Sequence, residues 1–222
     1  GFVGRHVVAE LRRRSITTRV VCRPNIESIS WSNGVEVVTL SGPGYSATDW
    51  VDAVSSCDVV IHLAARAHVL RDEHVDPARA FHEANVDFAV SCATAAVNAG
   101  VGRFIFMSSV GVHGGASGLR PFHPDSDLAP NTLYAHSKAV AERVLAEVVG
   151  GSGMELTIIR PPLVYGPRAP GKFEALVRAV KRGWPLPFGL VTGNRRSFVA
   201  VENLVNLVAV CLDHPSAANQ TF

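Results

Sequence analysis

The sequence predicts an α/β fold in which helices cover both faces of a doubly wound parallel sheet, followed by a small C-terminal lobe. Segments rich in β-branched residues alternate with helical segments up to about residue 160, which is the order that βαβ units require. Residues 58–63 form a near-continuous apolar run, as expected for a parallel strand buried on both faces. The alternation is then lost, so we expect two units, 1–160 and 161–222.

The composition is that of a globular protein. Of the 222 residues, 47% are hydrophobic and 18% are charged, which argues against a disordered chain. No run approaches the roughly 20 apolar residues of a membrane span. A net charge of +2 lacks the basic footprint of a nucleic-acid binder. The four cysteines lie far apart and the histidines share no ligand spacing, so we expect no metal site. No signal peptide is recognisable, which favours a cytoplasmic protein.

Each expected element has a local signal. Val3, Val7 and Leu11 recur at helical spacing, and arginines follow where positive charge suits a helix C-terminus. The β-branched segments 18–23 and 35–40 are expected to be strands. The other expected elements, in order, are a short helix 49–55 N-capped by Asp49, the strand 58–63, a long helix 77–99 between Pro77 and Gly100, the strand 103–107, a helix 132–149 ended by Gly150, the strand 155–159, and helices 173–182 and 203–212.

Both ends of the chain have the pattern of interrupted elements. A helix that opens on spaced glycines normally follows a strand, and no strand-like segment precedes Gly1. Residues 220–222 have the pattern of a strand that is beginning. We therefore expect a fragment that lacks a first strand and a C-terminal portion. Because the first strand is central in the sheet order 3-2-1-4-5-6, we also expect a gap between strands 18–23 and 58–63.

Two features point to a dinucleotide. Gly1 and Gly4 open the first helix, where glycines let a pyrophosphate approach the backbone and the helix dipole favours negative charge. Arg23 ends the next strand, at the position that reads the ribose in dinucleotide folds, and an Arg there favours NADP over NAD. Each signal is weak alone, since such glycines also occur in ordinary turns and a strand-end Arg is often only solvated.

Candidate catalytic side chains follow two later elements. Tyr134 and Lys138 are four residues apart and share one helix face, where an ammonium should lower the pKa of a phenol and make it a usable acid or base. Ser108 and Ser109 follow strand 103–107, at the edge where catalytic groups gather in such sheets. A hydroxyl there is placed to hydrogen-bond a substrate oxygen beside the tyrosine.

This order of motifs resembles the extended short-chain dehydrogenase/reductase superfamily. Within it, the chain resembles the NAD-dependent epimerase/dehydratase family and its nucleotide-sugar epimerases of the UDP-glucose 4-epimerase kind. The resemblance covers nearly the whole chain. Its motifs are Gly1 and Gly4, the strand end 62–65, Asn85, the set Ser109, Tyr134 and Lys138, and the segments 160–167 and 195–199.

The resemblance implies a Rossmann-like fold and a full set of site residues. The catalytic residues are Ser109, Tyr134 and Lys138. The residues expected to bind NAD or NADP are Gly1, Phe2, Val3, Gly4, Arg23, Leu63, Ala64, Ala65, Asn85, Ser108, Tyr134, Lys138 and Pro161. The residues expected to contact the substrate, which is expected to be a UDP-sugar, are Ser109, Tyr134 and Arg196. Homodimers are common among the proteins that the chain resembles.

The implied activity is a nucleotide-sugar 4-epimerase that works by hydride transfer through a 4-keto sugar. A 4-keto-sugar reductase or dehydrogenase would use the same side chains, and a non-catalytic dinucleotide-binding protein is the alternative of another class. The sequence also departs from the family pattern. Leu163 replaces a common Asn, His113 a common Tyr, and Arg23 the usual acid. Val110 and Gly111 stand where dehydratases carry Asp-Glu, which argues against sugar dehydration.

Overall fold

The computed structural model describes residues 1–22, 35–40, 44–67, 74–169, 172–186 and 193–222. The helices are α1 (Phe2–Arg13), α2 (Val51–Val54), α3 (Pro77–His82), α4 (Phe88–Asn98), α5 (Leu133–Val149), α6 (Lys172–Lys181) and α7 (Val201–Val210). The strands are β1 (Thr18–Cys22), β2 (Val35–Thr39), β3 (Val59–His62), β4 (Arg103–Met107), β5 (Glu155–Ile159), β6 (Leu163–Tyr165) and β7 (Phe198–Ala200). The α/β class predicted from the sequence is confirmed.

The central sheet has the order β3-β4-β5, with all strands parallel. Its outer edge continues into the last residues of the chain. Thr221 forms a parallel bridge with Ile158, and the Phe222 amide donates to the Ile158 carbonyl at 2.9 Å. The expectation that residues 220–222 begin a strand is therefore confirmed.

Strands β1 and β2 form a second parallel pair, separate from the central sheet. Within the described part of the chain, β1 pairs with β2 and β3 pairs with β4, so β1 and β3 are not hydrogen-bonded to each other. The predicted gap between these two strands is confirmed. Strands β6 and β7 form a third parallel pair.

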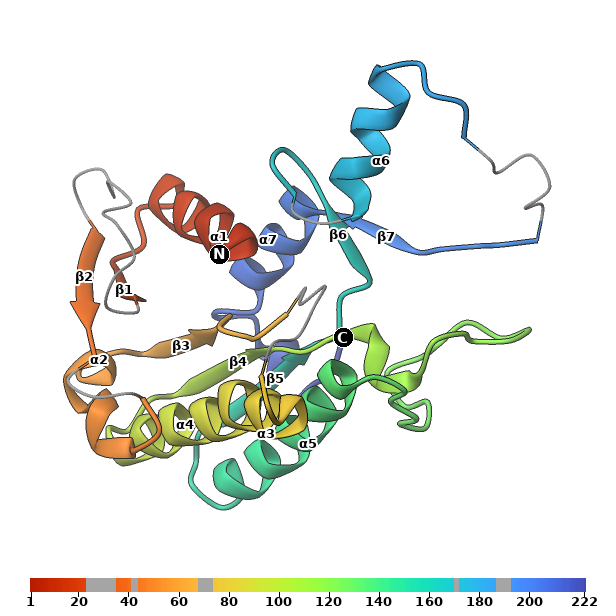
Figure 1. The fold of residues 1–222 in the computed structure, drawn as a ribbon. Helices are drawn as coiled ribbons and strands as arrows, with labels where there is room; N and C mark the ends of the chain where they lie inside the picture. The colour runs from red at the N-terminus through yellow and green to blue at the C-terminus, as the bar shows by residue number, and fades with distance from the viewer. Residues whose placement is uncertain (23–34, 41–43, 68–73, 170–171, 187–192) are drawn as a thin grey trace.

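Helices cover both faces of the central sheet, as Figure 1 shows. On one face, Phe104 and Phe106 pack with residues of α4 and α5. On the other face, Ile105 packs with residues of α1 and α7. This alternation along β4 follows from the period of two in a strand, and it buries both faces as the apolar character of the strands predicts.

The C-terminal residues do not all belong to a separate lobe. Val201 and Leu204 of α7 share a core with Val7 and Leu11 of α1, and residues 220–222 extend the central sheet. Strands β6 and β7 and helix α6 project from the body, as does the loop between β4 and α5 (Figure 1). The packing thus differs from the expected division at residue 160, because the chain leaves the first unit after β5 and returns to it in α7. None of the described helices has the length and apolar character needed to cross a membrane.

The expected long helix 77–99 is present with one irregularity. Its segments α3 and α4 are joined by a π-helical turn, Glu83–Asp87. A π-turn inserts an extra residue into the helical ladder and often marks a functional position. Here the turn carries Asn85, whose side chain is fully buried.

Candidate active site

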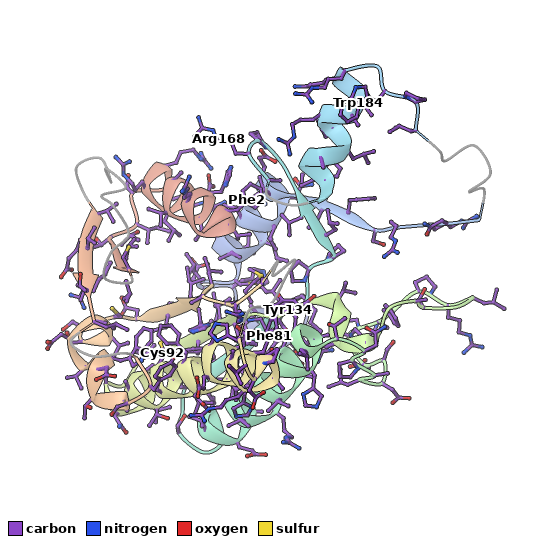
Figure 2. All side chains as sticks on the ribbon, in the orientation of Figure 1. Phe2, Phe81, Cys92, Tyr134, Arg168 and Trp184 are labelled. Atoms are coloured by element: carbon purple, nitrogen blue, oxygen red, sulfur yellow. The ribbon has the colours of Figure 1, made fainter. Side chains whose placement is uncertain are left out.

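The carboxyl edge of β3 and β4 opens into a large cavity below the N-terminus of α1. Figure 2 shows Phe2 of α1 and Tyr134 of α5, which both line this cavity from opposite faces of the sheet. The predicted site residues that line it are Gly1, Phe2, Val3, Gly4, Leu63, Ala64, Ala65, Ser108, Ser109, Tyr134, Lys138, Pro161 and Arg196. These residues are far apart in the sequence and all border this one cavity, which also extends along β3 to Asp58 and His214. Arg23 lies outside the described residues.

Ser109 is fixed by the turn that follows β4. It is the N-cap of a 3₁₀ turn, and its hydroxyl accepts a hydrogen bond from the Gly111 amide at 3.1 Å. The next amide, that of Val110, donates to the Pro161 carbonyl at 3.0 Å. A Cβ on Gly111 would lie 3.3 Å from the Ser109 hydroxyl oxygen, so glycine lets the turn close tightly here. These contacts hold the Ser109 side chain at the carboxyl end of β4 in the protein without substrate.

Tyr134 lies in the first turn of α5, which Thr132 caps by accepting the Ala135 amide at 3.1 Å. The Asn85 side chain holds the same turn of α5 through hydrogen bonds. Its amide nitrogen donates to the Ser137 hydroxyl at 2.9 Å, and that hydroxyl donates to the Tyr134 carbonyl at 2.8 Å. Its amide oxygen accepts the Arg66 backbone N–H at 2.7 Å. Asn85 therefore ties the loop after β3 to the start of α5.

Asn85 lies deeper than most of the other residues predicted to bind the cofactor. It is 0% exposed and is absent from the cavity lining, so its observed contacts are those that hold the start of α5. Ser108 differs from the expectation in a similar way. It borders the cavity, but its hydroxyl donates to Glu142 and its side chain is buried. The side chains of Asn85 and Ser108 thus hold neighbouring segments of the site in place through buried hydrogen bonds.

Lys138 is almost completely buried, and its ammonium lies 4.3 Å from the centre of the Phe106 ring. Burial lowers the pKa of Lys138 to about 7, while the charge of Glu142 opposes this shift. Beside it, burial and then the charge of Lys138 lower the pKa of His62 to about 3. His62 therefore stays neutral at neutral pH, while Lys138 exchanges its proton near pH 7.

The predicted lowering of the Tyr134 pKa is wrong for this structure. Burial raises the pKa of the Tyr134 phenol. The helical spacing does place Tyr134 and Lys138 on one face, but the Lys138 ammonium lies over Phe106. Desolvation therefore governs the phenol, which remains protonated at neutral pH.

The lobe contributes a different kind of surface. Arg196, in the segment that leads into β7, is exposed and lines the cavity. Leu163, which stands where the family often has Asn, lies on β6 and is 48% exposed. A cation at Arg196 could pair with a phosphate, while Leu163 offers no hydrogen bond.

Sequence reasoning missed one buried group, Glu142. It lies one helical turn after Lys138, and its carboxylate accepts hydrogen bonds from Arg160, with Nη2 at 2.6 Å and Nε at 3.0 Å. The spacing Tyr134, Lys138, Glu142 runs along one helix face and was available as a signal. Its partner Arg160 comes from the end of another strand, which spacing does not show.

Comparison with known proteins fits this arrangement. The model of the NAD dependent epimerase/dehydratase family matches residues 1–222. The chain belongs to this family. It is 39% identical to a UDP-glucose 4-epimerase of Vibrio cholerae, over 100% of this chain and 67% of that protein. The resemblance inferred from the sequence is confirmed.

Two other proteins similar to this chain differ in the activity that their names give. The chain is 32% identical to N-acetyl-alpha-D-glucosaminyl-diphospho-ditrans,octacis-undecaprenol 4-epimerase of Escherichia coli O157:H7, over 77% of this chain and 50% of that protein. Among solved structures, DesIV, a dTDP-glucose 4,6-dehydratase of Streptomyces venezuelae crystallised with NAD, superposes with a TM-score of 0.80 at 26% identity. That match covers 100% of this chain and 72% of DesIV.

Proposed function

We propose that this chain carries the active site of an NAD-dependent nucleotide-sugar 4-epimerase that works through a 4-keto sugar. One observation supports this above all. Ser109, Tyr134 and Lys138 line a single cavity together with the N-terminus of α1 and with Arg196 of the lobe. The UDP-glucose 4-epimerase of Vibrio cholerae is the relative that suggests a UDP-sugar.

The residues present fit a dinucleotide. A Cβ on Gly1 would meet nothing within 4 Å, and one on Gly4 would meet only the Leu63 side chain at 3.8 Å. The packing of the protein therefore does not itself require glycine there, whereas close approach of a ligand does. The first turn of α1 carries no acidic residue and has no side-chain cap, so its amides and dipole suit a pyrophosphate. Lys138 at the far side of the cavity suits a ribose hydroxyl.

The protein's own groups supply the proton chemistry. When bound, NAD supplies the hydride acceptor and donor for the sugar carbon. In its phenolate form, Tyr134 takes the proton of the C4 hydroxyl and later returns it to the C4 oxygen of the keto sugar. Because burial raises the pKa of the phenol in the protein without ligand, this step requires the phenol to lose its proton first. Ser109 donates a hydrogen bond to that same oxygen, and the fixed turn orients its hydroxyl for this contact. Lys138 lies one helical turn from Tyr134, and in its ammonium form it would favour the phenolate only if it turned from the Phe106 ring towards the phenol.

The two positions after Ser109 favour epimerisation over dehydration. Dehydration needs an acid that protonates the departing hydroxyl, and Val110 and Gly111 cannot provide one. A side chain at Gly111 would also crowd Ser109 and Ala135, whose Cβ is 3.6 Å from the ideal Cβ position. DesIV shares the fold as a dehydratase. We infer that this chain oxidises the sugar at C4, as a dehydratase does, and does not go on to eliminate water from the sugar.

The test is to incubate the purified protein with NAD and either UDP-glucose or UDP-N-acetylglucosamine, and to follow the sugar by NMR. The expected result is the galacto epimer, formed by the wild type and not by Tyr134→Phe. No epimer, together with NADPH consumption that depends on a nucleotide 4-keto sugar, would replace the epimerase by a reductase. Binding of dinucleotide with no turnover of either kind would indicate the non-catalytic alternative.

A further inference from the structure

A buried polar cluster lies behind the catalytic face of α5, with Glu142 at its centre. The side chains of Glu142 and Arg160 are only 5% and 11% exposed, and they form an ion pair at 2.6 Å. Ser108, which directly precedes the catalytic serine, donates its hydroxyl to the same carboxylate. One side chain therefore joins α5 to the ends of β4 and β5.

The remaining guanidinium nitrogen of Arg160, Nη1, contacts the long loop between β4 and α5. This nitrogen donates to the Pro124 carbonyl at 2.7 Å and to Nε2 of His113 at 3.2 Å. His113 must then be neutral with its proton on Nδ1, which donates to the Asp127 carbonyl at 3.2 Å. Residues of this loop line the cavity, so the cluster also links Glu142 to the wall of the site.

The charged and titratable groups around Lys138 come from three segments. On α5 they are Tyr134 and Glu142, on β3 it is His62, and β4 contributes the Phe106 ring. Arg160, which follows β5, carries the positive charge that is paired with Glu142. His62 stays neutral and Tyr134 stays protonated at neutral pH. Glu142 is thus the anion that acts on the Lys138 ammonium.

Stability alone is a weak explanation for such a pair. Removing two charges from water costs several kcal/mol per ion, and replacing a buried ion pair by apolar residues is often neutral or stabilising. Here the pair brings together the segments that carry Ser109 and Lys138. This arrangement favours a role of the ion pair in positioning the site residues over a role in stabilising the hydrophobic core.

We propose that Glu142 is a positioning residue that favours the ammonium form of Lys138 and holds the Ser109 strand end against α5. The catalytic part of this inference rests on the proposed function. The electrostatic part does not, because it concerns the protonation of Lys138 in the protein without substrate.

The protonation of Lys138 can be measured directly. The chain has three lysines, Lys138, Lys172 and Lys181, so protein labelled with ¹³C-lysine gives three sets of side-chain signals. The Lys138 signals are assigned by their loss in Lys138→Met. Their chemical shift against pH then gives the titration midpoint of Lys138 in each variant.

The deciding variant is Glu142→Gln, which removes the charge and keeps the shape. We expect the Lys138 midpoint to fall by about one pH unit or more, because the ammonium loses its anion while it stays desolvated. A purely structural role predicts the opposite sign, since a loosened and hydrated site would raise the midpoint. The matched control is Glu147→Gln, an exposed carboxylate on the same helix, which should leave the midpoint unchanged.

If Glu142→Gln does not fold because Arg160 is left unpaired, the double variant Glu142→Gln with Arg160→Gln keeps the site neutral. It should also lower the midpoint, since the charge of Glu142, and not that of Arg160, contributes to the pKa of Lys138. An unchanged or raised midpoint overturns the proposal. Failure of both variants to fold overturns it as well, because the pair would then be needed for folding itself.

A second measurement connects the cluster to catalysis. In Glu142→Gln we expect kcat for epimerisation to fall by about tenfold to a hundredfold, with KM for the nucleotide sugar within about twofold. The alkaline limb of the pH profile should move down with the Lys138 midpoint. Wild-type protein without epimerase activity would contradict the proposed function alone, and the Lys138 titration would still decide the role of Glu142.

Discussion

At the carboxyl edge of the central sheet, polar side chains such as Asn85, Glu142 and Arg160 are buried and hydrogen-bonded. In the lobe formed by β6, α6 and β7, large apolar side chains are in solvent, with Val180 57% and Trp184 58% exposed. Figure 2 shows Trp184 at the far end of α6, away from Tyr134. Internal hydrogen bonds and ion pairs fix the side chains of the first region. The side chains of the second region are exposed and can contact another molecule. We assign the bond-making chemistry to the first region and substrate contact to the second.

The largest effect should come from the fixed region. Tyr134→Phe removes the phenol that exchanges the substrate proton and leaves the ring in place. We expect kcat to fall about a thousandfold, as is typical for loss of a general acid or base, with little change in melting temperature. Steady-state kinetics and thermal unfolding check both parts. Tyr165→Phe, on the exposed surface of β6, is the control and should retain most activity. An equal fall in kcat in Tyr134→Phe and Tyr165→Phe would contradict the assignment of the chemistry to the first region.

Removal of the Asn85 brace should affect stability most. Asn85→Ala deletes the contacts to Arg66 and Ser137 and leaves a backbone N–H without its partner in the interior. We expect the free energy of unfolding to fall by about 3 kcal/mol, measured in urea. The control Asn98→Ala, at the exposed end of α4, should change it by less than about 0.5 kcal/mol. A small loss at Asn85 would mean that the start of α5 is held by other contacts.

The buried ammonium should make stability depend on pH. The pKa of Lys138 is lowered from 10.5 to about 7 in the folded protein. Between these values the unfolded chain binds a proton that the folded protein does not. This contribution to the free energy of unfolding is therefore complete above pH 10.5 and is lost as pH falls towards 7. Lys138→Met should lack this slope, so its stability relative to wild type should be greatest near pH 7 and decrease as pH rises.

Urea unfolding at several pH values between 7 and 10 measures this difference. Lys181→Met, at the exposed end of α6, should leave the wild-type slope unchanged. Parallel pH profiles for wild type and Lys138→Met would show that Lys138 is not desolvated as the fold indicates.

The smallest expected effect lies in the lobe. Arg196→Gln should raise KM for a UDP-sugar about tenfold and leave kcat within about twofold, because a charge-assisted hydrogen bond to phosphate is made in ground and transition state alike. Arg178→Gln on α6, which does not line the cavity, is the control. A fall in kcat equal to the rise in KM would show that the lobe also takes part in the chemistry.

Much of the fold could be predicted because its signals are local. Apolar runs such as 58–63, the cap before α5 and the glycines around α1 each depend on neighbouring residues. The set proposed to be catalytic could be chosen from the sequence because Tyr134 and Lys138 lie one helical turn apart and Ser109 follows a strand. The π-helical turn at Asn85 could not, and the partner that Asn85 meets there, Ser137, comes from another helix. The return of α7 to the face of α1 also depends on packing between distant segments.

The sequence by itself determined the α/β class, the family and the side chains that face the cavity, because periodicity and motif spacing are properties of short segments. Only the tertiary structure decided how those side chains are charged and held. Burial raises the pKa of Tyr134, against the expectation from its spacing to Lys138, and it lowers that of Lys138. The ion pair of Glu142 and Arg160 joins residues 18 positions apart. Desolvation and long-range pairing depend on which surfaces meet in the folded chain, and no local pattern encodes them.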